Sequence, residues 1–483
     1  MEFLLTPKKI ERRIFIKGIG FVSASLLLGT LGGCEELAES IRNRPIRRRL
    51  RTGSAAVDAD IATYRDAVKL MKDLSMSNPA DPRGWAKQAA IHGTNGVGFN
   101  FCQHGTDHFF SWHRAYLFYF EKICQGLTGN AKFGLPYWNW NQNPAIHSAY
   151  LDSTSPLFLS RFSTTMAGSS SIASGTLDTI FSDSNFFTFY AQIEGTPHNN
   201  VHSNIGGTFG NYGSASDPLF WNHHCMIDYC WNKWNIDLGN NNPNDPAWLN
   251  VAWNHFVDAN GNPANMTAGL TTIMPLLSYQ YESSAIGSHA AALVLKTKKA
   301  FQKVEKRIRA GADIHFDIKQ RVAIADTAII NIERPFTRET QITPGELSGL
   351  INNDMAREKI FVSIEYASLP SSSDFYVRVF INMPGASSGT PASDPHFAGT
   401  FAFFGTDMPG MNEHKHQPRF LVNITSTLQK LKDRGELKDG NPVSVQLVAV
   451  PFEGKFEKPN TNIQLNKIEL IVTPVIINAK EPG

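Results

Sequence analysis

Histidine is concentrated in one part of this 483-residue chain, where nine of its fifteen histidines lie between His92 and His224. Eight of these fall into two clusters, which consist of His92, His104, His108 and His113 and of His198, His202, His223 and His224. Imidazole nitrogen is a ligand for zinc, copper, iron and nickel. The distribution therefore predicts a metal site built from both clusters.

The spacing within the second cluster limits which histidines share a metal. His198 and His202 are four residues apart, which places both rings on one face of a helix. His223 and His224 are adjacent and diverge by about 100° on a helix, so we expect only one of them to be a ligand. His224 has Asp228 four residues later to back its ring, whereas His223 is expected to pack or to support the ligands.

Carboxylates do not recur at ligand spacing among these histidines. This argues against an iron site of two histidines and one carboxylate, and against a di-iron bundle built on Glu-x-x-His pairs. All-histidine sites on facing helices suit a pair of copper ions that binds dioxygen.

The surrounding sequence predicts a mainly α catalytic domain, a four-helix bundle holding the metal site, followed by a β-sandwich or barrel. Apolar residues recur at helical spacing over 56–75, 112–125 and 219–235, with loops rich in Gly, Ser, Asn and Pro between them. After about residue 326 the pattern alternates with period two, which is typical of strands. The predicted divisions are a tether over 35–54, a catalytic domain over 55–282, a charged helix or linker over 283–325 and a β domain over 326–483.

Residues 1–34 resemble an export signal rather than part of the fold. A basic segment with Arg12-Arg13 precedes a short apolar run, as in twin-arginine signals, and Leu31-Gly-Gly-Cys34 is similar to a lipobox. We therefore expect export to the cell envelope or periplasm, with a lipid anchor at Cys34; the alternative is a plain signal peptide with an incidental cysteine. The net charge of +2 gives no reason to expect nucleic acid as a partner.

Four motifs together resemble the type 3 copper family of tyrosinases, catechol oxidases and polyphenol oxidases. They are His104 with Trp112-His113-Arg114, Leu135-Pro-Tyr-Trp-Asn-Trp140, Glu194-Gly-Thr-Pro-His198 with His202, and Asp217-Pro-Leu-Phe220 with His223-His224. Asp374 to Asn382 and Tyr279-Gln-Tyr281 are similar to segments of the plant-type members. The resemblance covers most of 55–282 and supports a boundary near 282.

The resemblance implies two copper ions, phenols and dioxygen as substrates, and a role for each site residue. Copper A would be held by His92, His104 and His113, and copper B by His198, His202 and His224. Cys102 would be joined to His104 by a thioether, the alternative being a small buried thiol. Glu194 and Asn199 would hold a water that accepts the proton of a monophenol, the alternative being that Glu194 braces a loop.

Three further expectations concern a departure from the family pattern, the gate to the site and the control of activity. Tyr229 follows Asp228 where the family usually has arginine, which puts the pairing of Asp228 in doubt. The segment 209–212 is the candidate gate over copper A. The β domain is expected to cover the pocket and keep the enzyme latent, with loop 405–417 as a candidate contact.

Other functions compete with phenol oxidation. A catechol oxidase would lack the monophenol reaction, and a hemocyanin-like protein would bind oxygen reversibly. A zinc hydrolase and a structural domain with chance histidines are the remaining alternatives. The sequence leaves the oligomeric state and the physiological phenol open.

Overall fold

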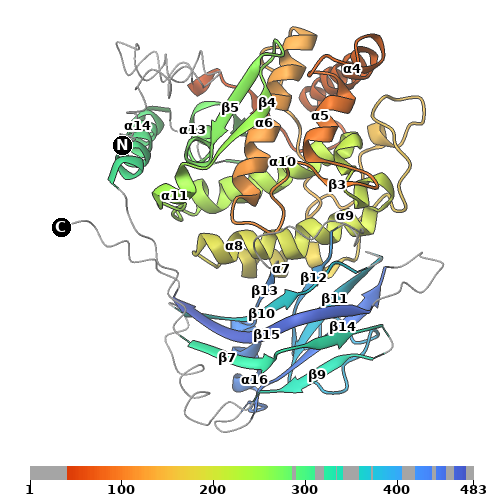
Figure 1. Cartoon of the computed structure of the whole chain (residues 1–483), viewed down its shortest axis with the longest axis vertical. Helices are drawn as coiled ribbons and strands as arrows, with labels where there is room; N and C mark the ends of the chain where they lie inside the picture. The colour runs from red at the N-terminus through yellow and green to blue at the C-terminus, as the bar shows by residue number, and fades with distance from the viewer. Residues whose placement is uncertain are drawn as a thin grey trace, which may run out of the picture.

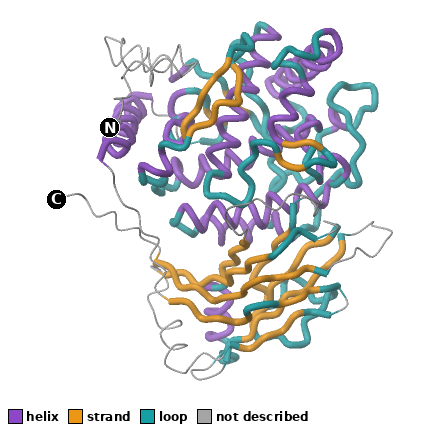
Figure 2. Tube along the Cα trace, viewed as in Figure 1, coloured by secondary structure: helices purple, strands orange, loops and turns teal. Residues whose placement is uncertain are grey.

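The computed structural model describes residues 41–284, 290–310, 320–332, 334–340, 358–370, 374–404, 419–437, 442–452 and 462–474. The described chain forms a helical part followed by a part rich in sheet, stacked one on the other (Figure 1, Figure 2). This agrees with the predicted change from helical to strand patterning. The predicted signal over 1–34, with Cys34, and the loop 405–417 lie outside the described residues.

The helical part is built around two helices that are buried on nearly every side. The helices of this part are α4 (Ala55–Ser77), α5 (Trp85–His92), α6 (Phe109–Thr128), α7 (Ser174–Phe181), α8 (Phe186–Ile193), α9 (Asn199–Ile205), α10 (Pro218–Asn232), α11 (Pro246–Leu249), α12 (Ala268–Thr271), α13 (Met274–Leu277) and α14 (Ala290–Ala310). In α6 and α10 nearly every side chain is buried, which is what an all-round apolar helix requires. The two helices contact each other and position the histidines that they carry.

Local signals fix where α10 begins and where α6 ends. Asp217 caps α10 by accepting a hydrogen bond from the Leu219 backbone N–H at 2.9 Å, and Pro218 occupies the first helical turn. Arg161 forms a buried ion pair with the same carboxylate at 2.5 Å. At the other end of α6, Gly129 adopts a φ of 69°, the left-handed conformation that favours glycine at a helix end. These signals set the position of His224 along α10.

Short strands tie loops to this helical core. They are β1 (Ile46–Arg47) with β6 (Gln280–Tyr281), β2 (Gly93–Thr94) with β3 (Gly98–Phe99), and β4 (Ala252–Val257) with β5 (Pro263–Thr267). Within the described residues 41–54 of the predicted tether, β1 pairs with β6 and ties this segment to the helical part. Ile41 and Leu50 are buried in the helical core, and the Arg47 side chain is completely buried. The segment folds inward because its arginines find buried carboxylates and carbonyls.

The segment predicted as a charged helix or linker contains α14, which packs onto the helical part. Val294 is buried in the helical core, and α14 contacts α11 and α13. Its exposed side chains include Lys296 and Lys299. Much of the predicted linker 283–325 is thus a helix docked on the first part of the chain, with its charged side outward.

The C-terminal part consists, within the described residues, of two sheets around one apolar core. Its elements are β7 (Gln320–Ala325), β8 (Ala328–Ile330), β9 (Phe336–Glu339), β10 (Glu358–Tyr366), β11 (Phe375–Ile381), β12 (Phe397–Ala402), β13 (Arg419–Asn423), α16 (Thr425–Asp433), β14 (Ser444–Pro451) and β15 (Ile463–Pro474). One sheet has the order β13-β10-β15-β7, with β8 also on β15, and the other has the order β12-β11-β14-β9. Neither order closes on itself, so the described strands form no closed barrel.

The two parts meet along β12 and β13 (Figure 1). These strands contact α8, α9 and the π-helical turn η3 (Glu194–His198) that joins the two helices. Ala191 of α8 shares a small apolar cluster with Phe361 and Leu421 of the β domain. None of the described helices is long and apolar enough to cross a membrane.

Candidate metal centre

The first group of candidate ligands comprises His92, Cys102, His104 and His113, whose ligand atoms all lie within 4.8 Å of one another. His92 is the last residue of α5 and His113 lies in the second turn of α6, while the other two occupy the turn before α6. Nε2 of His92 lies 3.4 Å from Nε2 of His104. The three histidines predicted for copper A are therefore brought together around one point.

The second group comprises His198, His202, His223 and His224, again with ligand atoms within 4.8 Å of one another. His198 ends the π-helical turn η3, His202 lies in α9, and the other two lie in α10. Nε2 of His224 lies 3.3 Å from Nε2 of His198 and 3.4 Å from Nε2 of His202. The predicted trio converges, and one ring nitrogen of His223 lies within the same 4.8 Å.

The two groups face each other. The His113 and His224 rings stack with centroids 4.2 Å apart and planes 11° apart, and the His104 and His198 centroids are 5.0 Å apart. The ligand-bearing elements are α5, α6, α9 and α10 with the turns before α6 and α9, so a regular four-helix bundle stays a prediction. The arrangement suits one centre with two metal positions.

Hydrogen bonds on the far side of the rings orient the histidines toward this centre. Nδ1 faces Tyr212 O at 3.1 Å in His92, Glu194 Oε1 at 3.0 Å in His104, Phe109 O at 2.8 Å in His113, Asn199 Oδ1 at 2.7 Å in His198, and Phe209 O at 2.6 Å in His202. Each partner is an oxygen acceptor, so Nδ1 carries the proton and Nε2 presents its lone pair. Within the described chain, Nδ1 of His224 alone among the six has no such partner.

Burial keeps these imidazoles neutral. It lowers the pKa of His92 to about 4 and that of His198 to about 3, and it lowers the pKa of His104, His113, His202 and His224 well below the usual value. Neutral nitrogen lone pairs 3.3–3.4 Å apart repel one another unless a cation lies among them. An all-imidazole donor set of this kind fits copper.

Cys102 lies beside the first group but contacts a different histidine from the one predicted. Its Sγ is 3.4 Å from Nε2 of His113. Burial raises the pKa of this thiol well above its usual value. The thioether to His104 stays a prediction.

Glu194 and Asn199 each support one ligand from behind. Glu194 Oε1 accepts hydrogen bonds from Nδ1 of His104 and from the backbone N–H of Gly105, at 3.0 and 2.7 Å. Burial raises the pKa of Glu194 to about 8, and two nearby cations would act in the opposite direction. Asn199 accepts from His198 and donates its Nδ2 to Ala402 O at 3.0 Å. The two side chains thus flank the centre, one on each metal position.

His223 packs beneath the second group, as one of the sequence predictions allowed. Its Nδ1 accepts a hydrogen bond from Trp140 Nε1 at 3.1 Å. Its ring lies nearly parallel to that of His198, with centroids 5.3 Å apart. With Nδ1 as an acceptor, the ring proton resides on Nε2, which disfavours His223 as a ligand.

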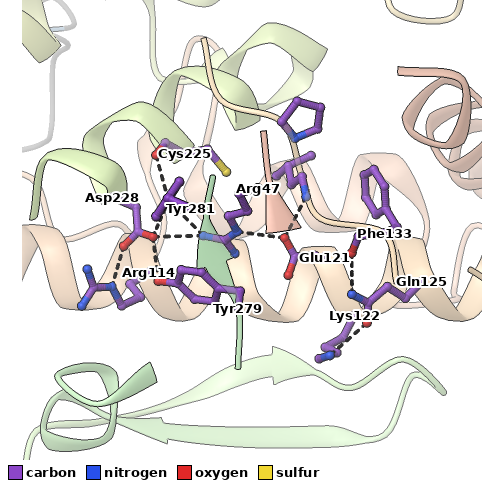
Figure 3. A network of polar contacts seen from close by, with 12 residues as sticks. Arg47, Arg114, Glu121, Lys122, Gln125, Phe133, Cys225, Asp228, Tyr279 and Tyr281 are labelled. Atoms are coloured by element: carbon purple, nitrogen blue, oxygen red, sulfur yellow. Dashed lines mark hydrogen bonds and ion pairs between the residues drawn. The ribbon is translucent and has the colours of Figure 1, made fainter. Parts of the chain in front are cut away.

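Asp228 does not back His224, which corrects that prediction. Its carboxylate accepts from Arg114 Nε at 2.5 Å, from Arg47 Nη1 at 3.0 Å and from the Tyr279 and Tyr281 hydroxyls at 2.6 Å each (Figure 3). Arg114 and Arg47 supply the positive charge that compensates this buried carboxylate. The carboxylate stays ionised, since these groups hold its pKa below the usual value despite burial.

The β domain places one side chain over the centre. Phe404, which is 5% exposed, has its ring centroid 4.3 Å from that of His202 and 4.9 Å from that of His104. Behind it, Asn199 Nδ2 and Ser203 Oγ donate to the carbonyls of Ala402 and Phe403. Local sequence patterning gave no signal for Phe404, because its neighbours in space lie some 200–300 residues earlier.

The candidate gate segment 209–212 braces ligands through its backbone. Phe209 O and Tyr212 O accept the two hydrogen bonds from His202 and His92 described above. The Tyr212 ring packs edge-on against Phe99, with centroids 4.6 Å apart. The aromatic residue beside the first group that sequence reasoning missed is therefore Phe99, whose ring stacks on His104 at 4.7 Å.

The central region matches a known family. Residues 82–171 and 150–237 match the model described as the common central domain of tyrosinase, and these ranges contain both histidine groups. The chain resembles the type 3 copper tyrosinase family, and its relatives there are oxidoreductases.

Relatives and solved structures extend the likeness over both parts of the chain. It is 27% identical over 463 residues to tyrosinase HcTyr1 of Hahella sp. (strain CCB-MM4), covering 81% of this chain and 93% of that one. It is 25% identical over 498 residues to polyphenol oxidase C, chloroplastic, of Solanum lycopersicum, covering 88% and 75%. A latent aurone synthase (polyphenol oxidase) structure superposes with a TM-score of 0.62 at 19% identity, covering 90% of each chain. The family resemblance read from the motifs is thereby confirmed.

Proposed function

We propose that this protein uses dioxygen to oxidise ortho-diphenols to ortho-quinones and also hydroxylates monophenols next to their oxygen. The observation that carries the proposal is the pair of facing histidine groups, whose unprotonated Nε2 atoms converge to 3.3–3.4 Å. The likeness to tyrosinases and polyphenol oxidases supports copper phenol oxidase activity, and the monophenol reaction is the finer part of the proposal.

Six histidines would hold the metal, three at each position. His92, His104 and His113 would bind copper A, and His198, His202 and His224 would bind copper B. The copper pair would supply dioxygen binding and the two-electron oxidation of the phenol. The protein would supply fixed ring orientation through the five Nδ1 hydrogen bonds, and exclusion of water through the buried aromatic surroundings.

A proton acceptor is needed for a monophenol, whose hydroxyl is neutral at pH 7. Glu194 and Asn199 would hold a water between them that accepts this proton. Support comes from their placement beside His104 and His198, and from the hydrogen bonds that fix both side chains. Beside two cations the Glu194 carboxylate would be ionised and would orient the water as an acceptor.

Cys102 would be joined covalently to His104, a link that would limit the ring's motion. The thiol lies within 4.8 Å of the ligand atoms of the first group, which supports the proposal. The link removes two protons and two electrons, which dioxygen at the copper pair would accept, so intact-mass measurement of copper-loaded protein tests it. A free thiol that reacts fully with an alkylating reagent after denaturation would refute it.

The β domain would keep the enzyme latent, with Phe404 in the place where a substrate ring must sit. The contact of Phe404 with ligands of both groups supports this.

Export by a twin-arginine signal with a lipid anchor at Cys34 is proposed from the sequence alone. The substrates would be a small phenol and dioxygen.

Oxygen consumption by copper-loaded Phe404→Ala full-length protein is the decisive experiment, with tyrosol and 4-methylcatechol as substrates. Uptake with both establishes the proposed pair of reactions. Uptake with the catechol alone makes the protein a catechol oxidase and removes the role of the Glu194–Asn199 water. Reversible oxygen binding without turnover would favour a hemocyanin-like carrier, and oxygen-independent hydrolysis with bound zinc would favour a hydrolase.

Phe452→Ala is the matched control for Phe404→Ala. Phe452 is a buried phenylalanine of the same domain that packs on Tyr376, away from the metal centre. If removal of any buried ring loosened the domain enough to activate the enzyme, both variants would gain activity. If only Phe404→Ala activates the enzyme, the latency is due to the Phe404 ring over the histidines.

A further inference from the structure

Phe99 is held rigidly beside copper A by the hairpin that follows His92. Its backbone pairs with Gly93 across β2 and β3, and the next residue, Asn100, donates its N–H to the His92 carbonyl at 3.0 Å. Gly93 is packed so closely that a Cβ there would lie 2.6 Å from Tyr212 O. The hairpin is therefore pressed against the loop that braces His92, and it cannot shift without disturbing that ligand.

The Phe99 ring forms part of the aromatic surface over the first histidine group. It lies face to face with His104, with centroids 4.7 Å and planes 28° apart, and edge-on to His92 at 5.3 Å. Tyr212 contacts its edge at 4.6 Å and 90°. Phe99 is half-buried in the folded chain, and its ring has a further aromatic partner.

That further partner in the folded chain is Phe404. The two rings are offset and nearly parallel, with centroids 5.6 Å and planes 28° apart, which is a favourable aromatic geometry. Phe404 at the same time lies over the His104 and His202 rings. A substrate ring that takes the place of Phe404 over both metal positions would make the same contact with Phe99.

We infer that Phe99 is a specificity-determining residue that recognises the face of the substrate ring at copper A. This inference rests on the proposed function. The substrate class it selects is a phenol or catechol with an unhindered, flat ring. The Phe99 ring excludes substrate rings that carry bulky substituents on their faces or flanks.

The test uses the copper-loaded full chain carrying Phe404→Ala, so that the seat is open while the β domain remains. Phe99→Ala, Phe99→Leu and Phe99→Tyr are added to this background, and kcat and KM are measured with 4-methylcatechol and with a bulkier 3,5-di-tert-butylcatechol. Phe101→Ala is the matched control, because Phe101 lies on the same hairpin and stacks instead on His255, with centroids 4.4 Å apart. Copper content is measured for every variant.

Phe99→Ala is expected to raise KM for 4-methylcatechol about 3- to 10-fold, the range typical of one lost aromatic contact, while kcat changes little. Phe99→Leu should behave similarly, and Phe99→Tyr should retain the parent KM because it keeps the ring. Relative activity on the bulky catechol should rise in Phe99→Ala. Phe101→Ala should match the parent.

Several outcomes overturn the inference. One is an equal KM for Phe99→Ala and Phe101→Ala, and another is a loss of kcat and copper in all three Phe99 variants, which would assign Phe99 a purely structural role. An unchanged preference between the two catechols would also refute it. If the Phe404→Ala parent itself consumes no oxygen with any phenol, the failure lies with the proposed function instead.

Discussion

Replacing Arg47 by alanine should strongly destabilise the helical part, although Arg47 lies outside the predicted catalytic domain. Its guanidinium bridges Glu121 at 2.9 Å and Asp228 at 3.0 Å, and it stacks on the Tyr279 ring at 3.7 Å (Figure 3). Arg47 is completely buried, and the Glu121 side chain is 1% exposed. The pair is thus fully removed from water.

The loss of stability in Arg47→Ala can be estimated from the partners that Asp228 and Glu121 retain. Asp228 keeps Arg114 and two tyrosine hydroxyls. Glu121 keeps only the backbone N–H of Leu135 at 2.9 Å, since its Oε1 has no partner among the described residues. Removing one partner of a buried ion pair costs about 3–5 kcal/mol, because an uncompensated charge stays buried. Arg47→Ala should lose a free energy of unfolding in that range.

The assay is urea unfolding of copper-free protein followed by tryptophan fluorescence, so that metal binding does not add to the stability. Arg48→Ala is the matched control, because Arg48 pairs with Asp60 at 2.8 Å while one quarter exposed. A partly exposed pair should cost less than about 1 kcal/mol. The double variant Arg47→Met with Glu121→Leu should recover much of the loss, because it leaves no unpaired charge. The reasoning fails if Arg47→Ala is no more destabilising than the control.

Other parts of the structure give three further predictions. Asn199→Ala should lower oxygen uptake with tyrosol more than with 4-methylcatechol in the Phe404→Ala background, and equal losses would remove its proton-handling role. His113→Ala should remove one of the two copper ions, and retention of both by metal analysis would contradict its ligand role. Burial raises the pKa of Asp183 to about 6, so the folded state keeps a proton that the unfolded state releases. Stability should therefore fall as pH rises from about 4 to 6, by roughly 3 kcal/mol from this group. The stability of Asp183→Asn relative to the parent should rise over the same window, and a constant difference would exclude this assignment.

The sequence by itself determined those features that depend on local spacing. The four-residue separation of His198 and His202 predicted that their rings share a face, and their centroids are 4.6 Å apart. Asp217-Pro218 marks the start of α10, which sets where His224 falls. The change of pattern after residue 320 predicted a separate sheet-rich part. These features follow from helix and strand periodicity, which is encoded within a few turns of chain.

Only the tertiary structure decided the contacts between distant segments. The run of arginines over 42–51 is polar in composition and indicates a tether. Arg47 is nevertheless buried, because it pairs with Glu121 and Asp228, which lie in two separate helices. Asp228 was expected to back His224 four residues earlier, but four side chains from elsewhere in the chain donate to its carboxylate instead. Phe404 reaches the histidines only because β12 docks along α9. Such pairings depend on packing over hundreds of residues, and no local period in the sequence records them.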